Sequence, residues 1–556
     1  MRRYAAPVVL AGVFAFLLSC NPLLGPLPSG MVSAAMVQQV PYSGTFQYTV
    51  DPGSTPRDVY FVFTNPSLTQ NAASVPTVSG SISVDGKGIP APASQPLSST
   101  NSAPQSLTDR IAEFNRNPRA YLPASAFPGP SAAVVSSLPA QNDVADYVHA
   151  TFTTGTFYTN LNADGTGAGP VSATCRDVVG PVSFADGRSR TLSVWVDDTY
   201  WNVDANQATT ATFASKFLAG PAESSADIYH WDTSVVGEPW GPQNDPSLIT
   251  WDPHNTVTIL LTRLNGSYAP GSPVIVGYYW AKDNFSTSAL PGSNQRIMFY
   301  IDSYLYNTNP TLVYSTLAHE FQHMIQFYQK QVVLGATVGT DTWINEMGSM
   351  IMEDLVADKL NVDGPRGVLT GDAGGANNNA GRFPLFNKYS NLSLAVTGSN
   401  FGVVQYSVAY AFGSWLTRNY GGPALLTRIV QCPQTDYTAV ANAAAAFSGR
   451  TETMEGLLQK WAASVLISDD TSAPPGYRYN TGTWTSFSLG SETFNLGSIN
   501  VFNYSPALTV YSSSVPIPAA PYYSSNIYFK AASMLAGPRT FSVTIPSGTG
   551  MSVVLK

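Results

Sequence analysis

The chain has 556 residues, which is enough for two or three domains. Only 11% of the residues are charged, the formal net charge is −8, and the sequence contains no basic cluster, which argues against nucleic acid as a partner. The chain is rich instead in Ser, Thr, Asn and Tyr, a balance that suits an exported protein with a polar but weakly charged surface.

Residues 1–19 are typical of an export signal. Arg2 and Arg3 precede an apolar run from Ala5 to Leu18, and this run is too short to span a membrane. We therefore predict that the chain is exported and that residues 1–19 are a signal peptide.

The end of this signal, Leu17-Leu18-Ser19-Cys20, resembles a bacterial lipobox, in which the signal is cut before the cysteine and its thiol is lipidated. An ordinary signal that is cut nearby is the alternative. Because Asn21 rather than Asp follows Cys20, the lipobox resemblance implies the outer membrane in a bacterium with two membranes. Residues 20–39 have no sustained period and would form a tether.

Residues 40–106 predict a small N-terminal β-sandwich-like domain followed by a linker. Alternating runs at Gly44–Val50 and Val59–Thr64 are separated by turn residues. The stretch Gly86–Ser106 is rich in Pro, Ser and Ala, which is typical of a linker.

Residues 107–474 predict a mixed α+β domain that begins with a short helix at Leu107–Asn115. Runs rich in β-branched and aromatic residues then predict strands at Arg190–Asp197, Val257–Leu264, Val274–Trp280 and Ile297–Ile301. An edge strand of such a sheet could hold an extended peptide by main-chain pairing, and the pattern leaves open which strand this is.

The clearest chemical signal is Thr316–Tyr328, TLAHEFQHMIQFY, which carries His319, Glu320 and His323 in the spacing HExxH. Its apolar residues recur at three- and four-residue steps, and Asn309–Pro310 upstream offers a cap and a first-turn residue, so the segment is predicted to be helical. Both imidazoles then project from one face and can bind one metal ion, with Glu320 beside the open position.

A second periodic run begins at Thr342–Met350, TWINEMGSM, and offers the third ligand that a catalytic zinc needs. Glu346 lies 23 positions after His323 (346 − 323), far enough for a turn and an antiparallel second helix. A third His in the pattern HExxHxxGxxH is excluded because those positions hold Gln326 and Gln329. The predicted ligand set is therefore His, His and Glu.

Together HEFQHMIQF and WINEMGSM resemble the gluzincin group of zinc peptidases, and most of all the hyicolysin-type family of secreted bacterial neutral metalloproteases. The resemblance covers about residues 170–470 and is specific at the metal site, where Asn345-Glu346 matches the Asn-Glu pair of gluzincins. It implies a gluzincin-like catalytic domain at residues 107–474, in which a β-sheet lobe carries the HExxH helix and a helical lobe follows. It also implies that Zn²⁺ is the cofactor.

Two departures from the family pattern concern the surroundings of the metal. The gap before Glu346 is slightly longer than in better-known gluzincins, and Met350 stands where thermolysin-like enzymes have an Asp. The carboxylate that orients a metal-bound histidine must then come from elsewhere, and Glu353 or Asp354 is our candidate.

The expected reaction needs a base and an oxyanion donor. Glu320 would take a proton from the attacking water and deliver it to the leaving amine. Thermolysin-like enzymes place a His against the oxyanion, but no His follows His323 in this sequence. Our candidate is Tyr406, because Tyr406–Gly422 is loosely similar to the tyrosine-bearing helix of aminopeptidase-like gluzincins. Tyr410, one turn on, is the alternative, and both tyrosines could instead be core residues.

The rest of the chain adds a helical lobe and a second β-domain. Asn361–Gly402 is rich in Gly and Asn, which argues against regular structure. We interpret this stretch either as a substrate-gating segment or as plain disorder. Helices are predicted at Gln405–Tyr420, Leu425–Val430, Tyr437–Phe447 and Thr453–Ile467. Strand-like runs such as Ile527–Lys530 and Thr540–Ile545 then predict a C-terminal β-domain at residues 475–556.

Several other polar residues are interpreted as structural. Cys175 and Cys432 could form at most one disulfide, and their spacing does not decide whether they pair. Three histidines outside the motif are interpreted as packing residues: His149, His230 and His254. Three acids match no EF-type calcium spacing and are interpreted as turn residues: Asp197, Asp198 and Asp204.

The favoured function is a secreted or lipid-anchored zinc endopeptidase that hydrolyses extracellular proteins. The alternative is a surface adhesin or binding protein on a metalloprotease-like scaffold with little or no turnover. The intact Glu320 favours the enzyme, because a scaffold needs metal ligands but no base. An aminopeptidase is a weaker option, since no exopeptidase pattern such as GxMEN is present upstream.

Overall fold

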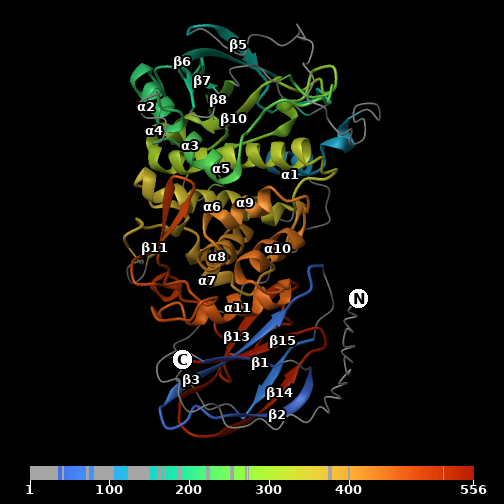
Figure 1. Cartoon of the computed structure of the whole chain (residues 1–556), viewed down its shortest axis with the longest axis vertical. Coiled ribbons are helices and arrows are strands. Elements are labelled where there is room, and N and C mark those ends of the chain that lie inside the picture. Colours follow the sequence, from blue (N-terminus) through green and yellow to red (C-terminus); the bar gives the residue numbers. More distant parts are fainter. Residues whose placement is uncertain are drawn as a thin grey trace, which may run out of the picture. The chain divides into compact units, whose positions relative to one another are not determined.

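A six-stranded sheet is the first layer of the fold (Figure 1). The computed structural model describes residues 36–556 except for 41–42, 70–73, 81–105, 123–150, 161, 163, 168, 185–188, 221–225, 251–255, 270–271, 273, 373–377, 399–400 and 518. In spatial order the strands are β5 (Thr154–Phe157), β6 (Val171–Ser183), β7 (Ser189–Asp197), β8 (Thr256–Thr262), β10 (Ile297–Asp302) and β9 (Gly277–Tyr278).

The centre of this sheet is parallel and its margins are antiparallel. Strands β7, β8 and β10 run parallel, whereas β5, β6 and β9 pair antiparallel with their neighbours. Every residue of β8 and β10 is buried, which explains their continuous apolar runs. The sequence located β7, β8 and β10 within two residues of their ends. Of the predicted strand Val274–Trp280, only Gly277 and Tyr278 pair, and they form an edge.

Helices occupy most of the middle of the chain. The α-helices are α1 (Leu107–Arg116), α2 (Gln207–Phe217), α3 (Ile228–Val236), α4 (Ser303–Thr308), α5 (Pro310–Phe327), α6 (Thr342–Leu360), α7 (Phe383–Tyr389), α8 (Val403–Asn419), α9 (Pro423–Val430), α10 (Tyr437–Ser448) and α11 (Met454–Leu466). Short 3₁₀ turns are η1 (Pro118–Tyr121), η2 (Ala281–Asn284), η4 (Gly364–Arg366) and η6 (Val501–Asn503), and η3 (Tyr328–Val333) is a π-helical turn.

Helix α5 is the predicted HExxH helix. Pro310 stands in its first turn and the Asn309 side chain accepts the backbone N–H of Leu312, so the predicted start is confirmed. The helix packs against β9 and β10 of the sheet on one side and against α6 on the other. It ends in η3, and the chain then returns so that α6 lies antiparallel to α5, with the start of α6 beside the last turns of α5.

Two further sheets form a β-sandwich. One has the order β1 (Met36–Val40), β15 (Gly550–Leu555), β3 (Arg57–Asn65) and β13 (Ser525–Leu535). The other has the order β2 (Gly44–Val50), β14 (Arg539–Ile545) and β4 (Thr77–Ser79). A separate hairpin of β11 (Trp484–Leu489) and β12 (Glu492–Gly497) packs on α6.

The sandwich corrects the prediction of separate N- and C-terminal β-domains, because strands from both ends of the chain share its sheets. Strand β3 pairs with β13 on one side and β15 on the other, and β2 pairs with β14. Phe61 and Phe541 meet edge to face in the shared core, at 5.2 Å between ring centroids. Alternating apolar residues predict a strand and its buried face, but they do not name the partner strand.

The sandwich has a hydrophobic core of its own, and the outer face of one of its sheets joins the core of the helical region. Residues 35–556 form one compact unit. Tyr60 of β3 and Val554 of β15 belong to the same buried cluster as the helices of the middle region, and α11 packs on β3, β13 and β15. None of the described helices is both long and apolar enough to cross a membrane.

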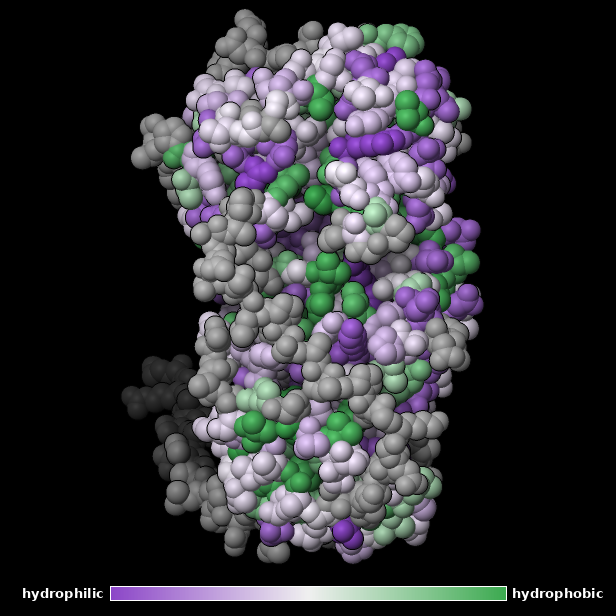
Figure 2. Space-filling view, turned by 180° about the vertical axis from the view of Figure 1, so that it is seen from behind, coloured by the Kyte–Doolittle hydropathy of each residue, from purple (hydrophilic) through white to green (hydrophobic). Residues whose placement is uncertain are grey.

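The surface agrees with the low charged fraction of the sequence. Figure 2 shows one face on which hydrophilic and weakly polar side chains predominate and hydrophobic ones lie in small groups.

Cys175 is buried, Cys432 is partly exposed, and both are free thiols, so the open question of their pairing is answered: they do not form a disulfide.

Candidate metal centre and active site

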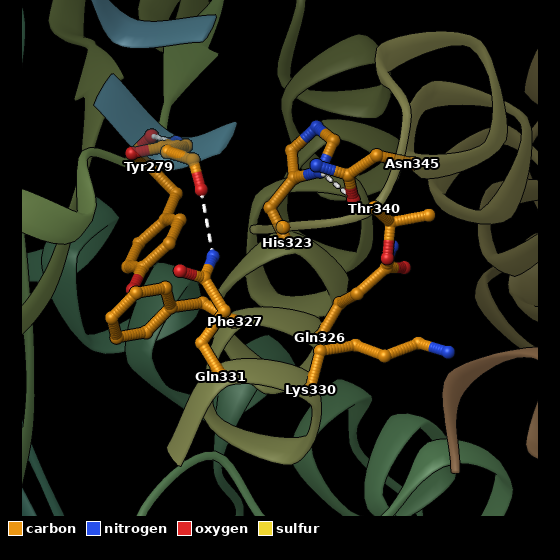
Figure 3. Close-up of a pocket in the computed structure, with 10 residues that line it drawn as sticks. Tyr279, His323, Gln326, Phe327, Lys330, Gln331, Thr340 and Asn345 are labelled. Atoms are coloured by element: carbon orange, nitrogen blue, oxygen red, sulfur yellow. Dashed lines mark hydrogen bonds between the residues drawn. The ribbon is translucent and has the colours of Figure 1, made fainter. Parts of the chain in front are cut away.

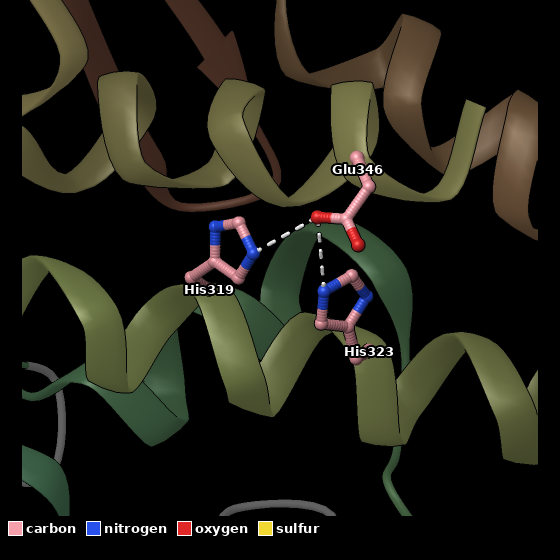
Figure 4. Close-up of side chains that lie close together, drawn as sticks. All are labelled: His319, His323 and Glu346. Carbon is pink, nitrogen blue, oxygen red and sulfur yellow. Dashed lines mark ion pairs between the residues drawn. The ribbon is translucent and has the colours of Figure 1, made fainter. Parts of the chain in front are cut away.

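Three side chains from two helices converge on one point. His319 and His323 lie one turn apart on α5, and Glu346 reaches towards them from α6 (Figure 4). Oε2 of Glu346 lies 3.2 Å from Nε2 of His319 and 3.5 Å from Nε2 of His323. The predicted ligand atoms all lie within 4.8 Å of one another. The structure therefore brings together the three residues that the sequence proposed as ligands.

The Nδ1 atom of each imidazole already has a hydrogen-bond partner. Nδ1 of His319 lies 2.8 Å from Oε1 of Glu353, and Nδ1 of His323 lies 3.0 Å from Oδ1 of Asn345. Both of these oxygens accept hydrogen bonds, so Nδ1 carries a proton in each ring. Nε2 is therefore the nitrogen that turns towards Glu346, and once it gives up any proton its lone pair is placed as a metal ligand requires.

This donor set fits a divalent metal. Two imidazole nitrogens and a carboxylate oxygen face one another. Oε2 of Glu346 is buried, and among the described residues it makes ion-pair contacts with the two imidazoles but no regular hydrogen bond. Ligands that bind one ion tetrahedrally at about 2.0–2.1 Å lie about 3.3–3.4 Å apart. The two measured separations lie on either side of that value. A cation is therefore the natural partner of this cluster.

The pKa shifts of the groups around the cluster also favour a positive charge at its centre. Burial would lower the pKa of His319, but Glu346 and Glu353 outweigh it and raise the pKa to about 10. Burial would raise the pKa of Glu346, yet the two imidazoles hold it well below its ordinary value. Burial likewise opposes ionisation of Glu353, and His319 reverses this and lowers the pKa. The site thus favours anionic carboxylates around a positive centre.

Glu320 faces the same space from the sheet side of α5. Its Oε2 accepts the backbone N–H of Tyr279 at 2.8 Å, next to the edge strand β9. The side chain is buried, and burial raises the pKa of Glu320 against the opposing charges of His319 and His323. We call the three proposed ligands His319, His323 and Glu346 the metal cluster. The Glu320 carboxylate is not part of it, as expected of a base rather than a ligand.

Of the two acids proposed to orient a histidine, only Glu353 does so. Its second oxygen accepts the Ser315 hydroxyl at 2.7 Å, which fixes the carboxylate against His319. Asp354 is one residue further round the helix and instead pairs with Arg418 at 2.9 Å. The proposal of Asp354 is therefore corrected, because successive helical residues point about 100° apart and face different neighbours.

A model of the peptidase M30 family matches residues 178–556, which include all of these site residues. The chain belongs to the peptidase M30 family. The neutral metalloprotease ShpI of Staphylococcus hyicus is 30% identical over 131 residues. That match covers 22% of this chain and 28% of the relative, so it spans less than a third of that protein's length. The predicted resemblance to hyicolysin-type neutral metalloproteases is confirmed.

In this M30 chain, Tyr406 rather than Tyr410 lies at the metal cluster. Tyr406 lines the cleft with the three ligands, and its ring centroid lies 6.5 Å from that of His319. Burial, and then the charges of Glu346 and Glu320, raise the pKa of Tyr406 well above its ordinary value, so its hydroxyl keeps its proton. Tyr410 points into the core, where its ring packs on Phe383.

Sequence reasoning missed several residues of the cleft, which has a volume of about 110 Å³. Helix α1, which precedes the range matched by the family model, forms one wall. The Asn115 side chain donates to the carbonyl of Tyr279 at 2.9 Å and accepts the N–H of Ala281 at 2.8 Å, so it caps the open edge beyond β9. The guanidinium of Arg382, which does not line the cleft, lies 5.3 Å from the centre of the Tyr406 ring. Neither residue belongs to a recognisable motif.

The predicted gating segment Asn361–Gly402 is partly regular, because it contains α7 and η4. Its residues 373–377 and 399–400 lie outside the described residues. Two of its other residues, Gly398 and Phe401, line the cleft, which keeps a gating role as a proposal.

Those of the residues interpreted as structural that the structure describes contact groups other than the three proposed ligands. His230 contacts Glu492 at 3.3 Å, whereas His149 and His254 lie outside the described residues. The three acids considered for calcium are engaged by other groups: Asp197 by Thr262, Asp198 by Arg176, and Asp204 by Arg263.

Proposed function

We propose that the chain is a zinc endopeptidase that hydrolyses peptide bonds of extracellular proteins. The observation that carries the proposal is the convergence of two imidazole nitrogens and one carboxylate oxygen beside a buried glutamate that is not a ligand. A surface-binding scaffold would need the converging metal ligands but not the additional buried glutamate.

In this proposal His319, His323 and Glu346 hold the ion, and the His₂Glu set is one that catalytic zinc uses. A bound zinc ion supplies a Lewis acid that acidifies water and polarises a peptide carbonyl. Glu353 and Asn345 keep the two imidazoles in the tautomer and orientation that binding requires.

Glu320 acts as the general base. Its raised pKa brings the carboxylate closer to the range in which it can both accept and return a proton. It takes a proton from water as the water attacks the peptide carbonyl, and it then delivers that proton to the leaving amine. The hydrogen bond from the Tyr279 N–H keeps the Glu320 carboxylate in place during these proton transfers.

Tyr406 stabilises the charge that develops on the former carbonyl oxygen. Its hydroxyl stays protonated, and it lies in the cleft beside the ligands, so it can donate to an oxyanion there. The substrate backbone lies along β9, because this is the edge strand that borders the cleft, and Gly277, Tyr278 and Tyr279 all line that cleft.

The export proposal rests on the sequence alone. Residues 1–19 are the proposed signal peptide, Cys20 is the proposed lipid anchor, and residues 20–39 are the tether that places the enzyme at the outer membrane or outside the cell. Comparing the membrane fraction of cells that express wild type or Cys20→Ser tests the anchor. Retention of the variant in the membrane fraction would contradict it.

The enzymatic proposal is tested by casein cleavage. Wild type should cut casein, a zinc chelator should abolish cutting, and added zinc should restore it. Glu320→Gln should lose activity while it retains the metal, because the amide cannot accept the proton. Activity in Glu320→Gln would refute its role as base, and a zinc-loaded wild type that cuts no protein would favour the surface-binding alternative.

A further inference from the structure

A small polar cavity borders the metal cluster on the side of His323 (Figure 3). Its volume is about 20 Å³, which is room for about one water-sized group. Five of its lining residues also line the catalytic cleft: Asn115, Tyr279, His323, Thr340 and Asn345. The cavity therefore adjoins the cleft and shares part of its wall.

Two polar atoms in the wall of this pocket lack partners in the part of the chain that the structure describes. The Gln326 and Thr340 side chains are 3% and 5% exposed. Nε2 of Gln326 and Oγ1 of Thr340 have no hydrogen-bond partner among the described residues. Buried polar groups are nearly always hydrogen-bonded, so both atoms indicate a group that enters the pocket.

Nε2 of Gln326 lies at the end of a chain of hydrogen bonds that starts at His323, one of the proposed metal ligands. Oγ of Ser349 lies 3.1 Å from Nδ1 of His323 and donates to Oε1 of Gln322 at 2.5 Å. Nε2 of Gln322 in turn donates to Oε1 of Gln326 at 2.6 Å. Each donor in such a chain polarises the next, which strengthens the terminal N–H as a donor. An acceptor in the pocket would complete the chain.

The polar groups of the pocket suit a neutral occupant better than an anion. Lys330 also lines it, but its ammonium group points away from Gln326 and donates to the carbonyls of Cys432 and Gln434, at 2.6 Å each. Burial also lowers the pKa of Lys330. The groups left to meet an occupant are an amide N–H, which donates, and a hydroxyl, which can accept.

We propose that this pocket binds the hydroxyl of a substrate serine or threonine next to the scissile bond. The substrate hydroxyl accepts from Nε2 of Gln326 and donates to Oγ1 of Thr340, and the small volume excludes larger side chains. This inference rests on the proposed peptidase function, since it names the substrate side chain that the same cleft selects.

The test begins with the cleavage sites in unfolded casein, read by mass spectrometry. Peptides are then made in matched pairs that carry Ser or Ala at each of the two positions that flank a cut bond. We expect wild type to cut the Ser peptide about tenfold faster in kcat/KM at one of the two positions, because a hydroxyl makes two hydrogen bonds that Ala lacks.

Two variants remove the pocket's polar groups separately. Gln326→Leu and the nearly isosteric Thr340→Val should each bring the Ser-to-Ala ratio close to one while they still cut the Ala peptide. Thr340→Val removes a hydroxyl without a described partner, so it keeps the test open if Gln326→Leu does not fold. Gln329→Leu is the matched control, because its side chain bonds instead to the carbonyl of Glu238, and it should keep the wild-type ratio.

The outcomes separate the two proposals. A wild type that cuts Ser and Ala peptides equally at both positions would overturn the pocket proposal and leave the peptidase standing. So would a Ser preference that survives in both variants. A wild type that cuts neither casein nor any peptide would overturn the peptidase proposal and this inference with it.

Discussion

Nδ1 of His319 and Oε1 of Glu353 lie 2.8 Å apart, and the other oxygen of Glu353 accepts the Ser315 hydroxyl. The carboxylate is thus held from both sides and fixes the imidazole that faces Glu346. We propose that this carboxylate orients the metal-binding imidazole, from a position one turn beyond Met350 on α6.

Removing this support should weaken metal binding. Glu353→Ala should lower zinc affinity by about 10–100-fold, because the imidazole loses its orientation and part of its basicity. Glu353→Gln keeps an oxygen that accepts the Nδ1 proton and should lose less. Competition with a fluorescent zinc chelator measures both, and an unchanged affinity in Glu353→Ala would contradict the assignment.

The neighbouring acid should behave in the opposite way. Asp354 and Arg418 form a buried ion pair with side chains 4% and 3% exposed, and Arg418 also donates to the carbonyl of Gly497. Asp354→Ala leaves the guanidinium buried without its carboxylate, which should cost about 3–5 kcal/mol of unfolding free energy. Denaturant unfolding measures this loss, while zinc affinity of the folded variant should stay at the wild-type value.

Tyr406→Phe should lower kcat by about 10²–10³-fold with little change in KM or zinc content, since the hydroxyl acts only on the developing oxyanion. Tyr410→Phe is the matched control, one turn away on α8, and it should stay close to wild type. The Tyr410 hydroxyl is buried without a partner among the described residues, so its loss removes no hydrogen bond shown there. Equal activities of the two variants would rule out the proposed donor.

Asp232 of α3 should make stability depend on pH. It is fully buried, neither oxygen has a hydrogen-bond partner among the described residues, and burial and then Asp227 raise its pKa well above the ordinary value of an aspartate. Above about pH 4 the unfolded chain therefore loses this proton while the folded chain keeps it, so rising pH favours unfolding.

Asp232→Asn removes this titration and should raise Tm relative to wild type. The difference should be smallest near pH 4 and grow as pH rises towards neutrality. The exposed Asp363→Asn is the control and should show no such trend. A Tm difference that shrinks with rising pH would contradict a protonated Asp232.

The sequence grouped the three proposed ligands correctly in space because their signal is local. The spacing of His319 and His323 fixes their common face once the helix is granted, and Glu346 sits early in the next periodic run. Glu320 and the pair of candidates Glu353 and Asp354 were proposed from the same helical spacing. The choice between Glu353 and Asp354 was not settled, because both lie within one turn and only packing shows which one meets His319.

Other features depended on contacts between distant segments. Asn115 reaches the edge beyond β9 from 164 residues away in the chain, and no motif marks it. The shared sandwich likewise joins β3 to β13 and β15 from the far end of the chain. Strand patterns carry period and burial but not pairing, so the two ends were predicted as separate domains.

The metal content of purified protein tests the central claim most directly. Wild type should carry one zinc ion per chain by elemental analysis, and Glu346→Ala should lose it, because the variant leaves two imidazoles without the third ligand. Zinc content that is unchanged in Glu346→Ala, or a folded wild type that binds no divalent metal, would contradict the proposed metal centre and the hydrolytic function that rests on it.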